Sequence, residues 1–294
     1  MKASIRFTLF SVCAAATLSA ACSYAQDTEF SRPPKVMVIG REYTKPGKGG
    51  TPHAKSESAF VRAMAAAKWP VNYIAMDSMT GVNRSLFITG YDSFAAWEKD
   101  SADQGKNTAL SAAIDRAWAT DGDLLTSTGV SAFSFRPDLS APGPDMEIAN
   151  MRYFDIIMYK VKPGHGKEWD DLVKIYLDGY KKAAPEVTWA TYEAMYGADN
   201  GGEFLVIQPL KSLSEVDKGL GDNKKFTDAI GAAGMKRLAE LNAECVESLQ
   251  ENLFHFNPKM SYPSEHFKTV DAAFWAPKPP VAPKPAAAAP AKPQ

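Results

Sequence analysis

Two short segments of the sequence carry side chains in the same order, and that order could surround a small molecule. Tyr73, Ala75, Asp77 and Met79 alternate along the first segment, and the second has Trp189, Thr191, Glu193 and Met195. Alternate residues of a β-strand share one face, so each set brings an aromatic, a small, an acidic and an apolar side chain together. A carboxylate on a mostly apolar face costs free energy unless it is paired. Asp77, Glu193, Tyr73 and Trp189 are therefore candidates for a ligand pocket. The alternative is that each acid meets solvent or a lysine at a strand end.

Histidine and tyrosine offer two further candidates on other strands. His255 lies between Phe254 and Phe256, and we expect the phenylalanines to face helices while His255 faces the other side of the sheet. There it could act as a general base or a haem ligand, or it could be an ordinary hydrogen-bonded residue of the sheet. Tyr159 shares one strand face with Asp155 and could add a polar group to the same cavity.

The remaining histidines and the cysteines do not indicate a metal or redox centre. His53 falls in a polar segment expected to be a loop, His165 at an exposed helix start and His266 near the C-terminus, and no two histidines have the spacing of metal ligands. We therefore predict no metal site. Cys245 lies in a helical pattern and is expected to be a core residue. The sequence also lacks a phosphate-binding glycine loop, a Gly-x-Ser-x-Gly elbow and a paired-cysteine motif.

These candidates are positioned by a series of elements that occurs twice. Strand patterns cover 36–43, 71–79, 85–89 and 130–136, with a polar connection at 48–58, a helix at 60–69 and a helical region at 93–121. The second series has strands at 152–161, 187–196, 204–208 and 253–257, with helical patterns at 165–182 and 212–249. Both series have the order strand, helix, strand, strand, helix, strand.

Matching motifs show that the two series correspond in detail. Lys-Pro-Gly occurs at 45–47 and 162–164, Gly81 corresponds to Gly197, and residues 133–140 correspond to residues 254–261. Corresponding motifs lie between 116 and 121 residues apart, which indicates internal duplication. We predict a first unit at 35–140, a linker at 141–149 and a second unit at 150–261. An aromatic extension (262–275) and a disordered tail of Pro, Ala and Lys (276–294) follow.

The second Lys-Pro-Gly motif carries a resemblance to a known superfamily. Residues 159–169, Tyr-Lys-Val-Lys-Pro-Gly-His-Gly-Lys-Glu-Trp, resemble the first strand and helix of the dimeric α+β barrel proteins, which include NIPSNAP-like and antibiotic-biosynthesis-monooxygenase-like proteins. The resemblance implies an α+β fold in which two ferredoxin-like βαββαβ repeats close into one intramolecular barrel. It places a ligand either inside the barrel or between the sheet and helices of one half.

The same resemblance leaves the activity open. The superfamily contains cofactor-free quinol oxygenases, haem-degrading enzymes, haem peroxidases and members without known activity. The Asn, Trp and His set of the haem-degrading members does not map onto this sequence. We predict no cofactor, and haem stays as the alternative.

The N-terminal segment indicates where the protein is located, and the charge of the chain restricts its partners. Lys2 and Arg6 precede an apolar run, and Ser23-Tyr24-Ala25 fits a cleavage site, so 1–25 is expected to be a signal peptide, with lipid attachment at Cys22 as the alternative. Without the signal and the tail, the 33 basic residues fall to 28 against 34 acidic ones, which argues against nucleic acid as a partner. No segment of the mature chain is long and apolar enough to span a membrane.

Three functions fit these observations. The first is a non-catalytic protein of the cell envelope, periplasmic or secreted, that binds a small apolar or aromatic ligand or acts as a scaffold. The second is an oxygenase or related oxidoreductase acting on a quinol or haem-like ligand. The third is a module that reaches an envelope partner through its tail. Whether the protein is an enzyme stays open at this point.

Overall fold

The computed structural model describes residues 32–141, 147–197 and 203–276. The predicted signal peptide, most of the predicted linker and all but the first residue of the predicted tail lie outside the described residues. The first series of elements is β1 (Val36–Thr44), α1 (Thr51–Ala67), β2 (Ile74–Ser78), β3 (Arg84–Tyr91), α2 (Phe94–Lys106), α3 (Thr108–Asp121) and β4 (Leu125–Phe135). The second is β5 (Tyr153–Val161), α4 (Gly166–Ala183), β6 (Ala190–Tyr196), β7 (Glu203–Leu210), α5 (Ser214–Cys245) and β8 (Val246–Phe256). Two short helices follow, α6 (Glu265–Val270) and α7 (Ala272–Trp275).

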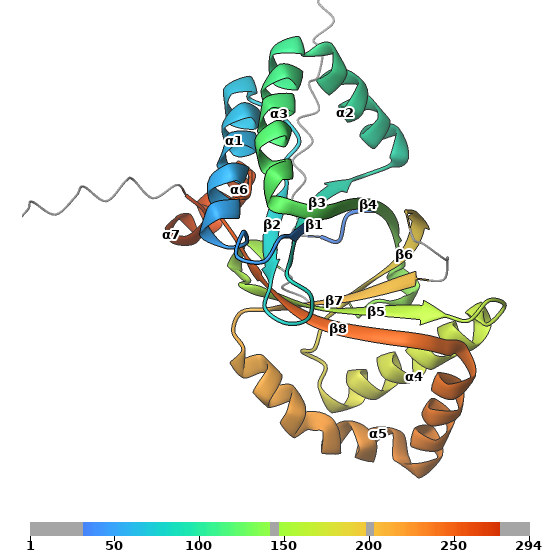
Figure 1. Cartoon of the computed structure of the whole chain (residues 1–294). Coiled ribbons are helices and arrows are strands. Elements are labelled where there is room, and N and C mark those ends of the chain that lie inside the picture. The colour runs from blue at the N-terminus through green and yellow to red at the C-terminus, as the bar shows by residue number, and fades with distance from the viewer. Residues whose placement is uncertain (1–31, 142–146, 198–202, 277–294) are drawn as a thin grey trace, which may run out of the picture.

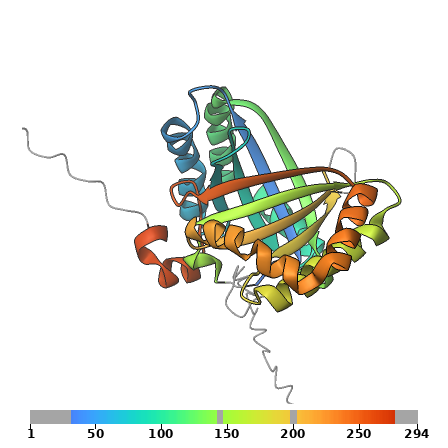
Figure 2. The same ribbon diagram turned by 90° about the horizontal axis from the view of Figure 1, so that it is seen from below.

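The eight strands form one closed antiparallel barrel in the order β1-β3-β2-β8-β5-β7-β6-β4. The order β4-β1-β3-β2 in the first half recurs as β8-β5-β7-β6 in the second, and the halves meet where β2 pairs with β8 and β4 pairs with β6. Helices α1, α2 and α3 lie on one side of the barrel and α4 and α5 on the other (Figures 1 and 2). The predicted α+β barrel is thus confirmed. Among the described residues, no helix has the length and apolar character needed to cross a membrane.

Strand alternation fills the inside of the barrel with large apolar side chains. One face of every strand points inward, and its buried members form a single core cluster that includes Met37, Ile39, Ile74, Met76, Leu86, Ile88, Phe133, Phe154, Ile156, Tyr192, Leu205, Ile207, Phe254 and Phe256. Burial of this surface is the main source of barrel stability. The opposite strand faces are left for the helices.

The amphipathic pattern of α4 fixes how the second half is covered. Trp169, Leu172, Val173, Tyr176 and Tyr180 form one apolar stripe, and all five contribute to the core between α4, α5 and the outer sheet face. In the first half, the helical region predicted at 93–121 is divided at Asn107, whose side chain accepts a hydrogen bond from the backbone N–H of Leu110 and begins α3.

Three predicted boundaries were wrong, and each error has a physical cause. Residues 48–58 were expected to be a loop, but α1 begins at Thr51, with Pro52 in its first turn, and places His53 and Glu57 on its buried side. Strand β4 begins at Leu125 and β8 at Val246, several residues earlier than predicted. Both early portions are largely exposed and polar, so they lack the apolar alternation by which a strand is recognised.

The matched motifs at the ends of β4 and β8 join the two halves. The Ser140 hydroxyl accepts a hydrogen bond from the backbone N–H of Thr191 at 2.9 Å and donates to the carbonyl of Arg136. The Ser261 hydroxyl accepts from the backbone N–H of Ala75 at 2.8 Å and donates to the carbonyl of Asn257. Each serine therefore ties the end of its own half to the second strand of the other half.

The substitution Ser261→Ala is expected to destabilise the protein by about 1 to 3 kcal/mol, because it leaves the buried N–H of Ala75 without an acceptor. Urea unfolding monitored by circular dichroism measures the change. Ser140→Ala should cost a similar amount, since its hydroxyl has the equivalent partners. Ser127→Ala, at an exposed position of β4, is the control and should change stability by less than about 0.5 kcal/mol. Equal stability of all three variants would contradict the joining role.

The C-terminal extension completes the barrel core at one end. Phe267 of α6 and Trp275 of α7 are 0% and 1% exposed and belong to the same core cluster as the inward strand residues. The Trp275 indole N–H donates to the carbonyl of Ala149 at 2.7 Å. Residues 262–275, expected to be an aromatic extension, are therefore part of the folded body.

Candidate functional site

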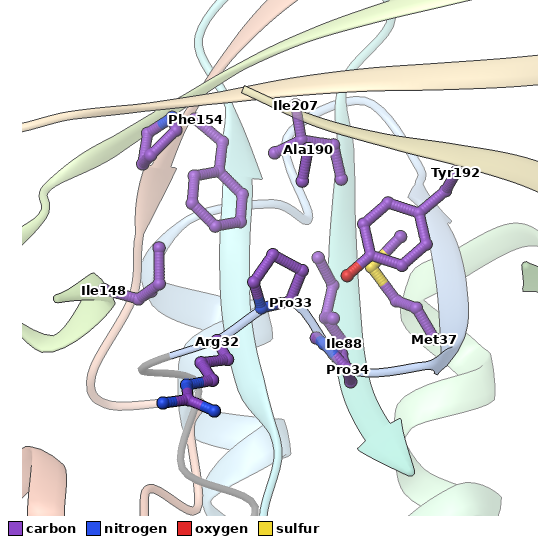
Figure 3. A pocket seen from close by; sticks show the side chains of 11 residues that line it. Arg32, Pro33, Pro34, Met37, Ile88, Ile148, Phe154, Ala190, Tyr192 and Ile207 are labelled. Carbon is purple, nitrogen blue, oxygen red and sulfur yellow. The ribbon is translucent and has the colours of Figure 1, made fainter. Parts of the chain in front are cut away.

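The barrel interior offers almost no room for a ligand. Two cavities of about 40 Å³ each lie within it. In the first, Phe154, Ile207, Tyr192 and Met37 converge on Pro33 (Figure 3). Ligand sites generally enclose about 300 Å³ or more, so the described part of the barrel interior is a packed core.

A larger cavity lies in the second half, between the outer sheet face and α4. It has a volume of about 320 Å³. Its walls are mostly aromatic and aliphatic side chains, namely Tyr159, Trp169, Tyr176, Tyr180, Trp189, Ile157, Leu172, Val173, Val187, Val206 and Leu249. Its polar members are Asp155, Gln208 and Glu251. An apolar cavity with a few polar groups is the usual form of a small-molecule site.

The strands bring the acidic groups together by register. Asp155 lies opposite Leu253 in the β5–β8 pair, and Ile157 lies opposite Glu251. Asp155 and Glu251 are therefore diagonal neighbours on the helix-facing side of the sheet. The paired strands thus hold two carboxyl groups side by side at the cavity wall, although their positions are almost 100 residues apart in the sequence.

The Asp155 carboxyl group differs from an ordinary surface acid. Its burial, together with the charge and hydrogen bond of Glu251, raises the pKa of Asp155 to about 7. One of its oxygens, Oδ1, is buried and has no hydrogen-bond partner within the described part of the protein. Near neutral pH this group can therefore hold or accept a proton, and it has an open position for a polar atom of a ligand.

The aromatic residues give the cavity flat walls and a second polar atom. The Tyr159 and Trp169 rings lie 4.7 Å apart, and the Tyr180 and Trp189 rings lie 5.7 Å apart in an edge-to-face arrangement. The buried indole N–H of Trp169 has no hydrogen-bond acceptor among the described residues. Aromatic faces favour planar aromatic ligands, and the free N–H could bind an oxygen atom of such a ligand.

Two of the six predicted pocket residues line this cavity, and two others lie in the other half. Tyr159 and Trp189 are part of its wall. Asp77 and Tyr73 lie on the helix-facing side of the first half, where Asp77 accepts hydrogen bonds from Ser85 and Asn257. Tyr73 and Trp189 lie on equivalent strand faces, as the sequence pattern predicted. The cavity described above lies beside Trp189 only.

Glu193 and His255 lie at the surface. Glu193 forms a 2.7 Å ion pair with Arg136, and its side chain is 41% exposed. His255 was expected to face away from the helices, but Phe254 and Phe256 point into the barrel and His255 points outward, 3.8 Å from Asp77. Phe254 and Phe256 belong to the barrel core cluster, and strand alternation therefore turns His255 to the outer face of the sheet.

The residues around the cavity do not fit a haem group. Haem iron is held by His, Cys, Met or Tyr, and of these only tyrosines line the cavity. Burial raises the pKa of Tyr159, Tyr176 and Tyr180, which disfavours the phenolate form that binds iron. We therefore derive no chemistry through haem.

Sequence reasoning missed Glu251 and the role of the α4 stripe. Glu251 was hidden because the start of β8 was not recognised as a strand. Residues 165–182 were predicted only as a helix, without a part in a site. A signal was present in the two tyrosines of α4, since each carries a hydroxyl that a fully packed core rarely accommodates.

Comparison with known proteins supports the fold and does not assign a function. No family model matches the chain, and no curated protein matches it. An anthrone oxidase-like protein has a TM-score of 0.51 at 12% identity, over 77% of this chain and 93% of its own. A protein proposed to be a monooxygenase from Fusobacterium nucleatum reaches 0.48 at 13%, over 76% and 93%. A mutant chlorite dismutase from Candidatus Nitrospira defluvii reaches 0.45 at 12%, over 81% and 95%. The chain is similar to these proteins in fold alone.

Proposed function

We propose that the second half of this chain binds a small planar aromatic molecule bearing a hydroxyl group, such as a phenol or a quinol. The observation that carries this proposal is the 320 Å³ cavity with aromatic walls and one carboxyl group at its side. On this proposal the unpaired Asp155 oxygen accepts a hydrogen bond from the ligand hydroxyl, and the unpaired Trp169 N–H donates one to a ligand oxygen. The protein is, on this proposal, an exported duplicated barrel that carries a ligand rather than a structural protein alone.

Binding of 2-naphthol, with naphthalene as the matched ligand without a hydroxyl, tests this proposal. We expect Asp155→Asn to weaken 2-naphthol binding by about 10-fold, because a hydrogen bond to a charged or partly charged acceptor contributes about 1.5 kcal/mol or more. Naphthalene binding should stay unchanged. Isothermal titration calorimetry with the full chain measures both.

Glu193→Gln serves as the control variant for this experiment. Glu193 does not line the cavity and is paired with Arg136, so its substitution should not alter binding of either ligand. If 2-naphthol does not bind the wild-type chain, or if Asp155→Asn and Glu193→Gln behave alike, the cavity is not the site we propose.

A second candidate function is oxidation of a bound quinol by molecular oxygen. The observation that favours it is the pKa of Asp155, which at about 7 suits a general base near neutral pH. In this reaction Asp155 accepts one phenolic proton and passes it on to the reduced oxygen, so that the quinol gives two electrons and two protons in total to O₂ and yields a quinone and hydrogen peroxide. An oxygen electrode with a naphthohydroquinone substrate tests it. Oxygen consumption above the uncatalysed rate that is lost in Asp155→Asn supports this function, and equal rates with and without protein exclude it.

A further inference from the structure

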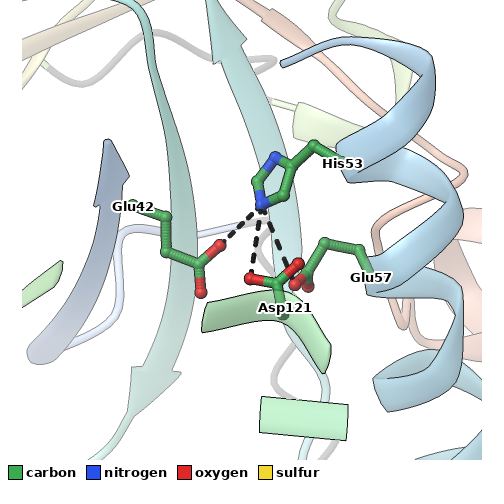
Figure 4. A group of neighbouring side chains, drawn as sticks. All are labelled: Glu42, His53, Glu57 and Asp121. Carbon is green, nitrogen blue, oxygen red and sulfur yellow. Dashed lines mark hydrogen bonds and ion pairs between the residues drawn. The ribbon is translucent and has the colours of Figure 1, made fainter. Parts of the chain in front are cut away.

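The first half contains a buried group of charged side chains that neither the cavity nor the barrel uses. Glu42 of β1, His53 and Glu57 of α1, and Asp121 at the end of α3 point toward one another (Figure 4). Their exposed fractions are 4%, 1%, 3% and 0%. We call these four residues the acidic cluster. Three separate elements deliver them to one point beneath the helices.

The acidic cluster lacks the cations that would normally accompany buried carboxylates. Within the described ranges, His53 is the sole ion-pair partner of its three carboxyl groups. Three carboxylates and one imidazolium would leave two uncompensated negative charges away from water, which is costly.

Unpartnered oxygen atoms point into the same space. Both carboxylate oxygens of Asp121 are buried without a hydrogen bond to any described residue, and so is Oε1 of Glu57. Buried polar atoms are nearly always paired, so three such oxygens around one point need an explanation. A cation between them would satisfy all three.

The distances in the acidic cluster match a metal coordination sphere. His53 Nε2 lies 2.8 Å from Glu42 Oε2, 3.7 Å from Asp121 Oδ2 and 3.9 Å from Glu57 Oε1. One ligand atom of each residue lies within 4.8 Å of all the others. Ligands that sit about 2.1 Å from a common ion are roughly 3 to 4 Å apart, so small side-chain shifts would close the site around an ion.

Hydrogen bonds outside the acidic cluster orient the His53 ring, so that its Nε2 atom faces the three carboxyl groups. Ser85 Oγ donates its hydrogen to Asp77, so its contact with His53 Nδ1 at 3.3 Å requires that Nδ1 carry the proton and donate to Ser85. A proton on Nε2 accounts for its 2.8 Å contact with Glu42 Oε2, and an ion bound among the three carboxylates would displace that proton and take the Nε2 lone pair. Metal-binding histidines are commonly held in this way by a partner on the other nitrogen.

We propose that Glu42, His53, Glu57 and Asp121 bind a divalent transition-metal ion of the Mn²⁺ to Zn²⁺ series. One imidazole and three carboxylates form a nitrogen- and oxygen-rich donor set of the kind these ions take. Neither histidine spacing nor the family resemblance predicted such a site.

Metal titration of the full chain, stripped with EDTA and dialysed, tests the proposal with Mn²⁺ and Zn²⁺ separately. We expect one ion per chain by calorimetry and by elemental analysis after dialysis, together with a higher melting temperature. Glu57→Gln and Asp121→Asn keep the side-chain shape and should weaken binding by more than about 100-fold. Ser85→Ala, which removes the partner of His53 Nδ1, should weaken it by about 10- to 100-fold.

A matched control separates this site from a more exposed one. His165, Glu168 and Glu244 also lie close enough to hold an ion, but they are partly or fully exposed. Glu168→Gln should leave the metal affinity of the acidic cluster unchanged.

The melting temperature of the metal-free protein gives a further test. In EDTA, Glu57→Gln should melt at a higher temperature than the wild-type chain because it removes one of three mutually repelling buried carboxyl groups, whereas a purely structural ion-pair cluster predicts a lower temperature.

Three results would overturn the proposal. The first is the absence of stoichiometric binding of both ions to the wild-type chain. The second is unchanged binding in Glu57→Gln and Asp121→Asn. The third is loss of binding in Glu168→Gln, which would place the ion at the exposed group.

Discussion

Asp155→Asn is expected to become more stable relative to the wild-type chain as the pH rises from 4 to 7, by roughly 2 to 4 kcal/mol in the free energy of unfolding. The folded protein raises the pKa of Asp155 from 3.8 to about 7 through burial and the neighbouring Glu251. Between these two values the folded state binds more protons than the unfolded state, so rising pH favours unfolding. Asparagine has no proton to lose, and the variant escapes this loss.

Urea unfolding at several pH values measures the difference between the two chains, which cancels the titration of all other carboxyl groups. Glu251→Gln should remove part of the same pH dependence, because the charge of Glu251 helps to raise the pKa of Asp155. Glu244→Gln, at an exposed position of α5, is the control and should run parallel to the wild-type chain. A constant difference between Asp155→Asn and the wild-type chain would show that Asp155 ionises normally in the folded protein. The proposed ligand contact would then lose its support.

Trp275→Ala is expected to destabilise the protein by about 3 to 5 kcal/mol, which is the cost of removing a large aromatic side chain from a core. Trp275 is 1% exposed and its ring lies 4.9 to 5.6 Å from the rings of Phe274, Phe267 and Phe256. The substitution also removes the hydrogen bond from the Trp275 indole N–H to the carbonyl of Ala149, and this carbonyl then stays buried and unpaired. Thermal and urea unfolding of the full chain measure the effect.

The matched substitution for this test is Trp118→Ala. Trp118 lies on α3 against Phe60 and is 44% exposed, so its removal should cost clearly less than the removal of Trp275. If the two variants lose equal stability, α6 and α7 contribute little to the barrel core. In that case the end of the barrel would have to be stable without them.

The two halves share a strand order but use the space between sheet and helices differently. In the second half, tyrosines and tryptophans surround a cavity with one pair of carboxyl groups. In the first half, the same layer holds the acidic cluster of Glu42, His53, Glu57 and Asp121. If both proposals hold, the chain binds an organic ligand on one side of the barrel and a metal ion on the other.

The order of the elements and their division into two units could be predicted from the amino-acid sequence. Alternation and helical spacing set the order of elements, and the correspondence of residues 133–140 with 254–261 predicted two units that join in the same way. These are local patterns that repeat at fixed spacing, so they can be recognised without knowing which strands are neighbours. Boundaries failed only at polar ends of elements, such as the start of α1 and of β8, where solvent exposure removes the apolar pattern.

The residues of the two candidate sites come together through strand register and helix packing, which the sequence does not reveal. Alternation divides the residues of a strand between two faces but does not say which face lies inside the barrel, and this is why His255 was placed on the wrong side. Strand register brings Glu251 beside Asp155, and helix packing brings Asp121 to His53. In both cases the partners lie more than 60 residues apart, so their contact depends on how the barrel closes and how the helices pack on it. No local pattern in the sequence contains that information.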